Sequence, residues 1–411
     1  MVKGKCPYWE RCESYNTVWK ICNECEGLYH SRYASCVKVM QKNDPSKIAI
    51  IIGTRAELIK MFPIMLELKK QKIDYVFIHT GQHSIQNLCD LLGVKTPDVI
   101  LSKEPTTSSK FNTQESKAVQ WAFRMILNIK RELKNFSNLQ YILCHGDTLS
   151  TACASVASSK LLNPFKKYQS VHLESGLRSF SNQDPFPEEI IRKIVTKFSD
   201  ILIAPSRQSK LNLKKYKNKR VIQLGNTILD SVYYATRISK KQNLKPFGKR
   251  FALVTIHRHE NIKSKERLSR IVDILCSISI PVYFSLHDNT KYKLIEFGLY
   301  NQLKSNPNIN FVKNIDYVSF IYQMSKCNLI ICDGGSMQEE SLIFKKPCII
   351  LRKNTERQEG LETNFQYLSN LNIQKTKEKV NEYLNPKFKI KTFENPYGKI
   401  GISKKIVRML K

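Results

Sequence analysis

Charged and histidine side chains stand directly behind short apolar runs along most of this chain. Arg55, Asp147 and Glu174 follow such runs in the first half, and the second half has His257, His287, Asp333 and Arg352 at the same kind of place. Carboxylates and histidines are the usual groups for proton transfer, and arginine suits a diphosphate. Loops are polar in any protein, so no single position decides the matter. The repetition at the ends of the runs indicates a binding cleft.

The elements that would position these residues are strands and helices in alternation. Continuous apolar runs, as expected of strands buried on both faces, are followed by helical stretches. The predicted strands are 48–52, 75–78, 141–144, 170–173, 251–256, 282–286, 329–332 and 348–351. This alternation predicts two α/β domains with parallel sheets, in which ligands bind outside the carboxyl ends of the strands.

The stretch 328–340 combines a strand, a glycine turn and the start of a helix. An apolar run leads into Asp333-Gly334-Gly335-Ser336, and a helix is expected from Met337. Backbone N–H groups beside a positive helix end bind phosphate. An ordinary strand-to-helix turn is the alternative, since Gly-Gly alone is a weak signal. Because the rest of the chain repeats the construction, we predict that a nucleotide diphosphate binds here.

The 411 residues carry a formal net charge of +32. Such a charge would suit nucleic acid, an anionic membrane or an acidic substrate. The lysines are spread over the whole chain, however, so a Lys-, Asn- and Ile-rich composition explains most of it. No apolar run approaches the roughly 20 residues that span a bilayer, and the first residues lack the apolar core of a signal peptide. We expect a cytoplasmic protein with no transmembrane segment and no nucleic-acid partner.

The twelve cysteines form two groups. The first group crowds into residues 1–44 and consists of Cys6, Cys12, Cys22, Cys25 and Cys36. In a cytoplasmic protein such a cluster binds metal more often than it forms disulfides. A structural zinc, an iron–sulfur cluster and free thiols all stay open, and no catalytic role is expected. The other seven lie mostly in apolar segments and are predicted to be small core residues.

Many short motifs resemble, in the same order, those of the UDP-N-acetylglucosamine 2-epimerase family. They are Gly53-Thr54-Arg55-Ala56-Glu57 with Lys60, His145-Gly146-Asp147-Thr148, Glu174-Ser175-Gly176-Leu177-Arg178, Pro187-Glu188-Glu189, Gly225-Asn226-Thr227 with Asp230, His257-Arg258 with Glu260, the glycine turn with Gln338-Glu339-Glu340, Thr355-Glu356-Arg357, and Asn395-Pro396-Tyr397-Gly398. The match runs from about residue 46 to residue 411, so the cysteine-rich segment lies outside it.

The resemblance implies a GT-B architecture and a homodimer. Two Rossmann-like domains, residues 45–235 and 236–395, would face a cleft, and a last helix within 396–411 would pack back on the first domain. Residues 1–44, which lie outside the resemblance, are expected to form a separate cysteine-rich segment, with metal binding among the alternatives that stay open.

The resemblance also implies which reaction is catalysed. Loss of UDP from the sugar gives a 2-acetamidoglucal, and UDP then re-adds with the opposite configuration at C2. A hydrolysing branch of the family adds water instead and releases N-acetylmannosamine and UDP. The run Gln338-Glu339-Glu340 looks more like the non-hydrolysing branch, which we favour. No metal or nicotinamide is expected for the reaction, whose product would serve cell-envelope polysaccharide synthesis.

Carried over by the resemblance, Asp147, Glu174 and Glu188 match the acid/base carboxylates, and His257 matches the active-site histidine. Removal of a weakly acidic C2 proton needs a positioned base, and an acid must face the other side of the ring. Carboxylates crowded in a cleft have pKa values that are pushed apart, which permits both roles. Which carboxylate is the base stays open. Each could instead be a helix cap or a surface acid.

The resemblance also names the residues that would hold UDP. They are Arg55, Lys60, His257, Gly334, Gly335, Ser336, Glu340 and Arg357, with Phe320 beside the uracil. Arginine and backbone N–H groups stabilise the charge that grows on a departing diphosphate. Glu340 would accept hydrogen bonds from ribose hydroxyls. Packing in the core is the alternative for Phe320.

The chain departs from the family pattern at a few positions. Ala56 and Gln358 stand where the family has proline, and Gly334-Gly335-Ser336 replaces Ser-Gly-Gly. Ser84 stands where an arginine is common, which puts an allosteric substrate site in doubt. Two other functions stay open. A GT-B glycosyltransferase would use a UDP-sugar but need an acceptor, and a non-catalytic nucleotide-sugar sensor would have no use for three carboxylates.

Overall fold

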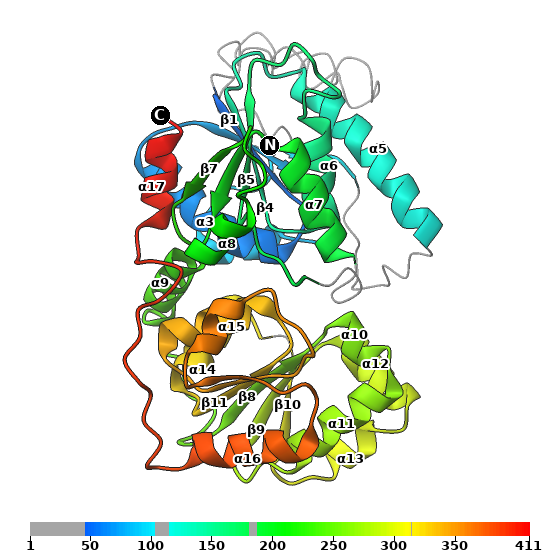
Figure 1. Ribbon diagram of the computed structural model, residues 1–411, viewed down its shortest axis with the longest axis vertical. Helices are drawn as coiled ribbons and strands as arrows, with labels where there is room; N and C mark the ends of the chain where they lie inside the picture. Colours follow the sequence, from blue (N-terminus) through cyan, green and yellow to red (C-terminus); the bar gives the residue numbers. More distant parts are fainter. Residues whose placement is uncertain (1–45, 103–114, 181–186, 314) are drawn as a thin grey trace, which may run out of the picture. The chain divides into compact units, whose positions relative to one another are not determined.

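The computed structural model describes residues 46–102, 115–180, 187–313 and 315–411 (Figure 1). The predicted metal-ligand cysteines of residues 1–44 lie outside the described residues, so the metal site stays a prediction. Contacts divide the chain into two compact units. Unit 1 holds the described residues up to Leu58, Leu68–His172 and Lys197–Ile201, and unit 2 holds Ile59–Glu67, Leu173–Thr196 and Leu202–Lys411.

The first sheet has seven strands in the order β3-β2-β1-β4-β5-β6-β7. The strands are β1 (Ile48–Ile52), β2 (Tyr75–His79), β3 (Val99–Ile100), β4 (Tyr141–His145), β5 (Gln169–Leu173), β6 (Ile201–Ala204) and β7 (Arg220–Gln223). The helices between and after them are α3 (Arg55–Lys70), α4 (Gln86–Leu92), α5 (Glu115–Leu133), α6 (Leu149–Ala157), α7 (Glu188–Phe198), α8 (Arg207–Asn212) and α9 (Ile228–Ser239). Strand β1 pairs in parallel with β2 and β4, so Ile48 lies between Tyr75 and Tyr141.

The second sheet has six strands in the order β10-β9-β8-β11-β12-β13. The strands are β8 (Ala252–Ile256), β9 (Val282–Leu286), β10 (Ile309–Val312), β11 (Leu329–Cys332), β12 (Cys348–Ile350) and β13 (Gln366–Leu368). The helices are α10 (His259–Ile262), α11 (Lys265–Cys276), α12 (Asp288–Glu296), α13 (Tyr300–Lys304), α14 (Tyr317–Lys326), α15 (Gly335–Phe344), α16 (Ile373–Leu384) and α17 (Ile402–Met409), with a short 3-10 helix, η2 (Gln358–Glu362).

Both sheets reverse their strand order at one place. In the first sheet the chain runs outward from β1 to β3 and then returns to the other side of β1 with β4. In the second sheet the same reversal lies between β8 and β11. Parallel α/β sheets bind ligands at this switch point, outside the carboxyl ends of the strands. The turns after β1, β4, β8 and β11 are therefore the expected positions of a ligand-binding site.

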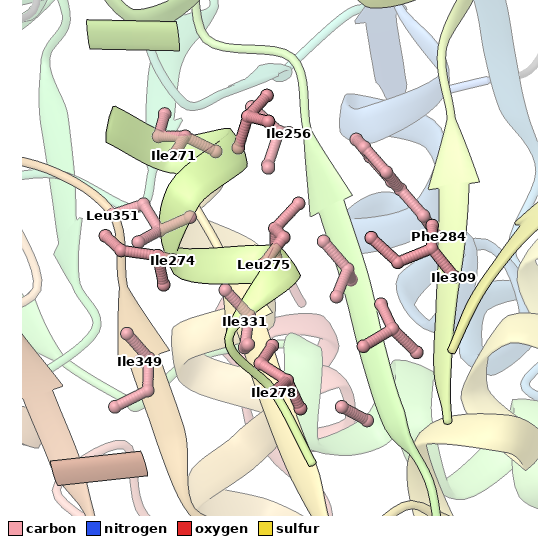
Figure 2. Packing of buried hydrophobic residues seen from close by; sticks show 14 of the residues in the cluster. Ile256, Ile271, Ile274, Leu275, Ile278, Phe284, Ile309, Ile331, Ile349 and Leu351 are labelled. Carbon is pink, nitrogen blue, oxygen red and sulfur yellow. The ribbon is translucent and has the colours of Figure 1, made fainter. Parts of the chain in front are cut away.

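The second sheet is buried on both faces, as its continuous apolar runs predict. Alternate residues of β8 enter different hydrophobic clusters, Val254 and Ile256 on one side and Leu253 on the other. Figure 2 shows the first side, where Ile271 and Leu275 of α11 pack over the sheet. The predicted α/β class with two parallel sheets is confirmed.

All predicted strands are present, within one residue at each end. Among the strands that sequence analysis missed, β3, β7, β10 and β13 are the outermost strands of the two sheets. An edge strand has a neighbour on one side only and mixes polar with apolar residues, so it lacks the continuous run that marks a central strand. Strand β6 is central and apolar, and it was missed as well.

The last helix, α17, is held by the buried carboxylate of Asp230 on α9. Asp230 accepts hydrogen bonds from the backbone N–H groups of Gly401 (2.5 Å) and Ser403 (2.6 Å). Among the cysteines of the described residues, all but Cys276 are buried, as predicted for small core residues. No helix in the described part of the chain is long and apolar enough to cross a membrane.

Candidate active site

Glu57, buried in the first turn of α3, joins the turns after β1 and β4 in unit 1. Its Oε2 accepts hydrogen bonds from the N–H groups of Gly53 (3.0 Å) and Thr54 (2.8 Å) and from the Thr54 hydroxyl (2.9 Å). The Thr54 hydroxyl accepts in return from the Glu57 N–H (3.2 Å), which completes a capping box. Oε1 of Glu57 accepts from the hydroxyls of Thr148 (2.9 Å) and Thr151 (2.7 Å). Burial raises the pKa of Glu57 above its usual value, against the effect of these hydrogen bonds.

Asp147 stands in the turn between β4 and α6, and both of its neighbours are held. Thr148 is the N-cap of α6, and its side chain accepts from the Thr151 N–H at 3.1 Å. On the other side, Nε2 of His172 hydrogen-bonds the carbonyl of Gly146 at 2.8 Å. Asp147 itself is half-buried. The turn therefore presents this carboxylate at the switch point of the first sheet.

Arg55 stands at the start of α3, across that switch point from Asp147. The side chain is exposed, and its Nε donates to the carbonyl of Ser84 at 2.9 Å. The turn after β2 is tied to α6 as well, because the Ser150 hydroxyl donates to Oε1 of Gln82 at 2.8 Å. Unit 1 thus fixes a cation and a carboxylate at neighbouring strand ends.

Asp333 has the corresponding place in the second sheet, in unit 2. Its fully buried carboxylate accepts from the N–H groups of His257 (3.1 Å to each oxygen) and Arg258 (2.9 Å) and from the side-chain amide of Asn261 (3.1 Å). His257 and Arg258 follow β8, and Asp333 follows β11. The carboxylate therefore spans the switch point between these strands.

The imidazole of His257 lies beside the same carboxylate, with Nδ1 3.5 Å from Oδ1 of Asp333. Desolvation lowers the pKa of His257, Asp333 opposes this, and Arg258 adds to the lowering. Because 43% of the side chain is exposed, water limits the size of this effect. The ring is neutral at neutral pH and can both donate and accept a hydrogen bond.

Side chains packed against the glycine turn explain why it contains glycine. Helix α15 begins at Gly335, with Gly334 as its N-cap, two residues before the predicted start at Met337. A Cβ at Gly335 would lie 2.5 Å from Cζ of Arg357, and one at Gly334 would lie 3.1 Å from Cε1 of His257. The start of this ten-residue helix therefore lies against a guanidinium and an imidazole, an arrangement that suits an anion.

Two carboxylates and two cations alternate in a buried cluster of unit 2. The Lys60 ammonium donates to Glu174 and, at 2.7 Å, to Glu339. Arg357 donates to Glu174 from Nη2 and to Glu339 from Nε, both at 3.0 Å. Asn226 adds a hydrogen bond to Glu339 at 3.0 Å. Burial alone would lower the pKa of Lys60, but Glu174 and Glu339 raise it above its usual value, so this ammonium is charged.

Glu174 adopts a left-handed backbone conformation (φ +63°) directly after β5. Residues other than glycine rarely do so. Such strain costs on the order of 1 kcal/mol or more and persists where surrounding contacts hold the residue, often at functional sites. The hydrogen bonds to Lys60 and Arg357 are contacts of this kind.

A second cluster surrounds the buried carboxylate of Glu356. Arg352 donates to its Oε2 at 2.9 Å, and Nη1 of Arg357 donates to its Oε1. The guanidiniums of Arg258 (3.6 Å) and Arg192 (3.8 Å) lie near the same oxygen. Burial would raise the pKa of Glu356, but these arginines hold it well below its usual range. These guanidiniums are shared with other carboxylates, because Arg357 also donates to Glu174 and Glu339, and Arg258 to Glu188.

The adjacent acids of α7 have different surroundings. Glu188 accepts from Nη1 of Arg258 at 2.7 Å, and 26% of its side chain is exposed. Glu189 is buried and accepts from the Ser179 N–H (3.1 Å) and from Arg192 (3.0 Å). Glu189 therefore stabilises the preceding turn, and Glu188 is the acid that solvent reaches.

Glu340 follows Glu339 on α15 and is buried beside Tyr317. The Tyr317 hydroxyl lies 3.3 Å from Oε1 of Glu340. Burial, together with the charge of Glu339, raises the pKa of Glu340 to about 8. The carboxyl is therefore protonated at neutral pH and can donate a hydrogen bond as well as accept one. Phe320 packs against the hydrophobic cluster that contains Met324 and Met337. Core packing, the alternative considered for Phe320, is thus present.

The chain is similar to known proteins over most of its length. The family model of UDP-N-acetylglucosamine 2-epimerase matches residues 66–411. The chain is 34% identical over 381 residues to a UDP-N-acetylglucosamine 2-epimerase of Methanocaldococcus jannaschii, a match that covers 89% of this chain and 98% of that protein.

The chain belongs to the UDP-N-acetylglucosamine 2-epimerase family.

Two solved structures of the family, both with ligand, share the fold of this chain. The crystal structure of the M. jannaschii epimerase in complex with UDP-GlcNAc and UDP has a TM-score of 0.76 at 32% identity and covers 88% of this chain and 99% of that chain. The Neisseria meningitidis epimerase bound to UDP-GlcNAc has a TM-score of 0.72 at 28% identity, with the same coverage. The predicted GT-B-like fold, family and epimerase class are thereby confirmed.

Apart from Glu188, Glu340 and Phe320, the residues predicted for this epimerase site lie in three groups. Lys60, Glu174 and Arg357 are in direct contact, and His257 lies against the glycine turn, which ends with Ser336. Arg55 and Asp147 stand at the switch point of unit 1. Their roles in catalysis and binding stay predictions.

Sequence analysis gave no role to several residues that the clusters depend on. They are Glu57, Arg192, Asn226, Arg258, Glu339 and Glu356. All but Arg192 lie inside motifs that were used to recognise the family, so the signal was available. What was missing was the direction of each side chain, since Glu339 and Glu340 are neighbours about 100° apart around the same helix.

Proposed function

We propose that this protein is a UDP-N-acetylglucosamine 2-epimerase that inverts C2 by elimination and re-addition of UDP. The observation that carries the proposal is the buried cluster in which Lys60 and Arg357 each bridge Glu174 and Glu339. Arg357 also lies against the first residue of α15. The chain thus presents two cations, a helix N-terminus and a carboxylate within one contact network, as loss of an anionic leaving group from a C–H acid requires.

The proposed elimination removes the C2 proton and breaks the bond between C1 and the UDP oxygen. The electron pair of the C–H bond becomes the second bond between C1 and C2, and the C1–O pair leaves with UDP. Lys60, Arg357 and the N–H groups of Gly334 and Gly335 would stabilise the growing charge on the diphosphate. Re-addition returns a proton to the other face of C2 and the UDP oxygen to C1. Atoms and charge balance without an added cofactor.

The carboxylates are assigned to proton transfer in this proposal. Glu174 is the candidate in unit 2 that contacts both cations, and Glu188 is the one that solvent reaches. Asp147 is the candidate in unit 1. The neutral imidazole of His257 beside the glycine turn would hydrogen-bond the diphosphate. The proposal requires no metal or nicotinamide. Structural zinc or an iron–sulfur cluster in residues 1–44 stays a separate prediction.

Proton NMR in deuterated water tests the proposal directly. With UDP-N-acetylglucosamine alone, we expect UDP-N-acetylmannosamine to form, with deuterium at C2 of both sugars. Free N-acetylmannosamine with UDP would place the protein in the hydrolysing branch instead. Absence of both turnover and exchange would overturn the proposal for this substrate. Turnover that appears only after an acceptor is added would support the glycosyltransferase alternative.

A different UDP-sugar is a second candidate substrate, because one relative acts on such a sugar by name. The chain is 31% identical over 323 residues to a UDP-2,3-diacetamido-2,3-dideoxy-D-glucuronate 2-epimerase of Pseudomonas aeruginosa, a match that covers 75% of this chain and 84% of that protein. The same NMR assay with both sugars compares them, and the better substrate is the one with the higher kcat/KM.

We also propose that the protein is a homodimer joined through α5. Val119, Phe123 and Leu127 repeat every four residues on this helix and are 69%, 63% and 49% exposed. Met125, Ile129 and Leu133 of the same helix are buried in unit 1. A second apolar face of this kind marks an interaction surface.

Light scattering after size exclusion tests the dimer. We expect Phe123→Glu with Leu127→Glu to give a monomer, and Lys210→Glu, on the exposed part of α8, to stay dimeric. A monomeric wild type would contradict the proposal. A cytoplasmic location and a place in envelope polysaccharide synthesis go with this function and stay predictions.

A further inference from the structure

We propose that Glu57 is a positioning residue that holds the turns after β1 and β4 in register, so that Arg55 and Asp147 meet one substrate. The inference rests on the proposed function, because it assigns a purpose to the placement of these two residues. Glu57 touches neither a substrate nor a reacting atom in this role. It acts through the backbone and hydroxyl groups on either side of the switch point in the first sheet.

The hydrogen bonds of Glu57 go beyond what a helix cap needs. A capping box is complete when Thr54 and Glu57 bond each other, which uses Oε2 alone. Oε1 instead receives the hydroxyls of Thr148 and Thr151, which are 91 and 94 residues away in the sequence. One buried carboxyl therefore bonds two strand ends through five hydrogen bonds.

The two turns that Glu57 joins carry the predicted functional groups of unit 1. Arg55 is the residue after Thr54, and Asp147 is the residue before Thr148. The other flank of Asp147 is held by His172 through the Gly146 carbonyl. If Oε1 lost its partners, the turn with Asp147 would keep its strand but lose its direct bond to the turn with Arg55. A displacement of about 1 Å in such a pair costs on the order of 100-fold in rate.

Glutamine should replace Glu57 with little loss. In Glu57→Gln the amide oxygen can take the place of Oε2 and accept from the N–H groups of Gly53 and Thr54. The amide N–H₂ then faces the hydroxyls of Thr148 and Thr151, which can turn round and accept. Alanine removes both halves of the link. Both variants lack the charge of Glu57, and only glutamine keeps its hydrogen-bond geometry. Comparing them therefore shows whether the geometry or the charge matters.

The test combines turnover with amide hydrogen exchange in the full-length protein. For Glu57→Ala we expect kcat to fall about 10- to 100-fold, with the Kd for UDP changed much less. We also expect faster exchange in 145–152 as well as in 53–58. Glu57→Gln should stay within about threefold of wild type in kcat. Thr54→Val, which breaks only the capping side, should speed exchange in 53–58 but leave 145–152 and kcat unchanged.

Two results would overturn the inference. One is a folded Glu57→Ala protein with wild-type kcat. The other is slow exchange in 145–152 in that variant, which would leave Glu57 as a helix cap only. If Glu57→Ala does not fold, Thr148→Val against Thr148→Ser tests the link from its other end. Exchange is then read in 53–58, because Thr148 is also the N-cap of α6, and unchanged exchange there would overturn the inference. If the wild type turns over no UDP-sugar, the proposed function fails, and exchange in 145–152 alone decides whether the link exists.

Discussion

The switch points of the two sheets are built alike but differ in their hydrogen-bond partners. Each is spanned by one buried carboxylate, Glu57 in the first sheet and Asp333 in the second. Glu57 meets backbone N–H groups and three hydroxyls, which can turn to suit either protonation state. Asp333 meets N–H groups throughout and lies beside the imidazole of His257. The hydroxyl partners of Glu57 can accept as well as donate, so a neutral glutamine can replace it. The N–H partners of Asp333 only donate, so this position requires an acceptor.

Charge is also divided unevenly between the two units. Unit 2 gathers Lys60, Arg357 and the arginines around Glu356, whereas unit 1 presents Arg55 on its surface. In the proposed reaction the diphosphate needs cations and the C2 proton needs a base. We therefore predict that the cations of unit 2 supply most of the diphosphate binding. Four predictions test it, from the largest expected effect to the smallest.

Lys60→Met is expected to have the largest effect, because it removes a cation from the buried cluster of unit 2. It removes one of the two cations that hold Glu174 and leaves the buried Glu339 with Arg357 and Asn226. Loss of one preorganised stabilising group costs about 100- to 1,000-fold in kcat, so we expect a fall of that size. Steady-state kinetics measure it, with Lys70→Met, an exposed change at the end of α3, as the control. Similar rates in both variants would remove Lys60 from the mechanism.

Asp333→Asn compared with Glu57→Gln tests the difference between the two links. We expect the asparagine to destabilise the protein by about 1–3 kcal/mol. When its oxygen accepts from Arg258 and Asn261 at the position of Oδ2, its amide N–H₂ must face the N–H group of His257 at the position of Oδ1. The glutamine should cost under about 1 kcal/mol, because hydroxyls can reverse. Urea unfolding of both variants beside wild type measures the difference. Equal losses would show that the hydroxyl partners give Glu57 no such tolerance.

Gly335→Ala and Gly334→Ala refine the account of the glycine turn. A Cβ at Gly335 would meet the guanidinium of Arg357 at 2.5 Å, and the arginine must move away. We expect UDP binding to weaken about tenfold, which is about 1.4 kcal/mol. At Gly334 the nearest atom, of His257, would be 3.1 Å away, so the loss should be smaller. Isothermal titration with UDP compares the two, and the reverse order would count against Arg357 as a diphosphate ligand.

Glu340→Gln tests the neutral carboxyl of α15. The folded pKa is about 8 against a usual value of 4.5, so between these pH values the folded state binds the extra proton. Stability from this group is complete below about pH 4.5 and is lost as pH rises through about 8. We expect thermal unfolding to show wild type losing stability relative to Glu340→Gln from pH 5 to pH 9. Exposed Glu378→Gln is the control, and a constant difference for Glu340→Gln would contradict the shifted pKa.

Much of the fold was readable from the sequence because central parallel strands are buried on both faces. Ile48–Ile52 and Leu329–Cys332 are continuous apolar runs, and both are strands at these residues. Edge strands such as β10 and β13 lack that pattern and were missed. The family followed from motifs that stand at strand ends, where substitution changes chemistry rather than packing. Lys60, Glu174, His257 and Arg357 were all predicted from such motifs, and their roles stay predictions.

The partners of those residues were decided by the tertiary structure alone. Sequence order does not say that Glu339 turns toward Lys60 while Glu340 turns toward Tyr317, or that Glu189 is buried and Glu188 is partly exposed. It also does not reveal that Glu57 reaches Thr148 across 91 residues. Which side chains are brought together depends on how the helices and strands pack, and a pKa depends on burial and on neighbouring charge. The sequence determined which chemical groups this protein has, and the packing decided which of them interact.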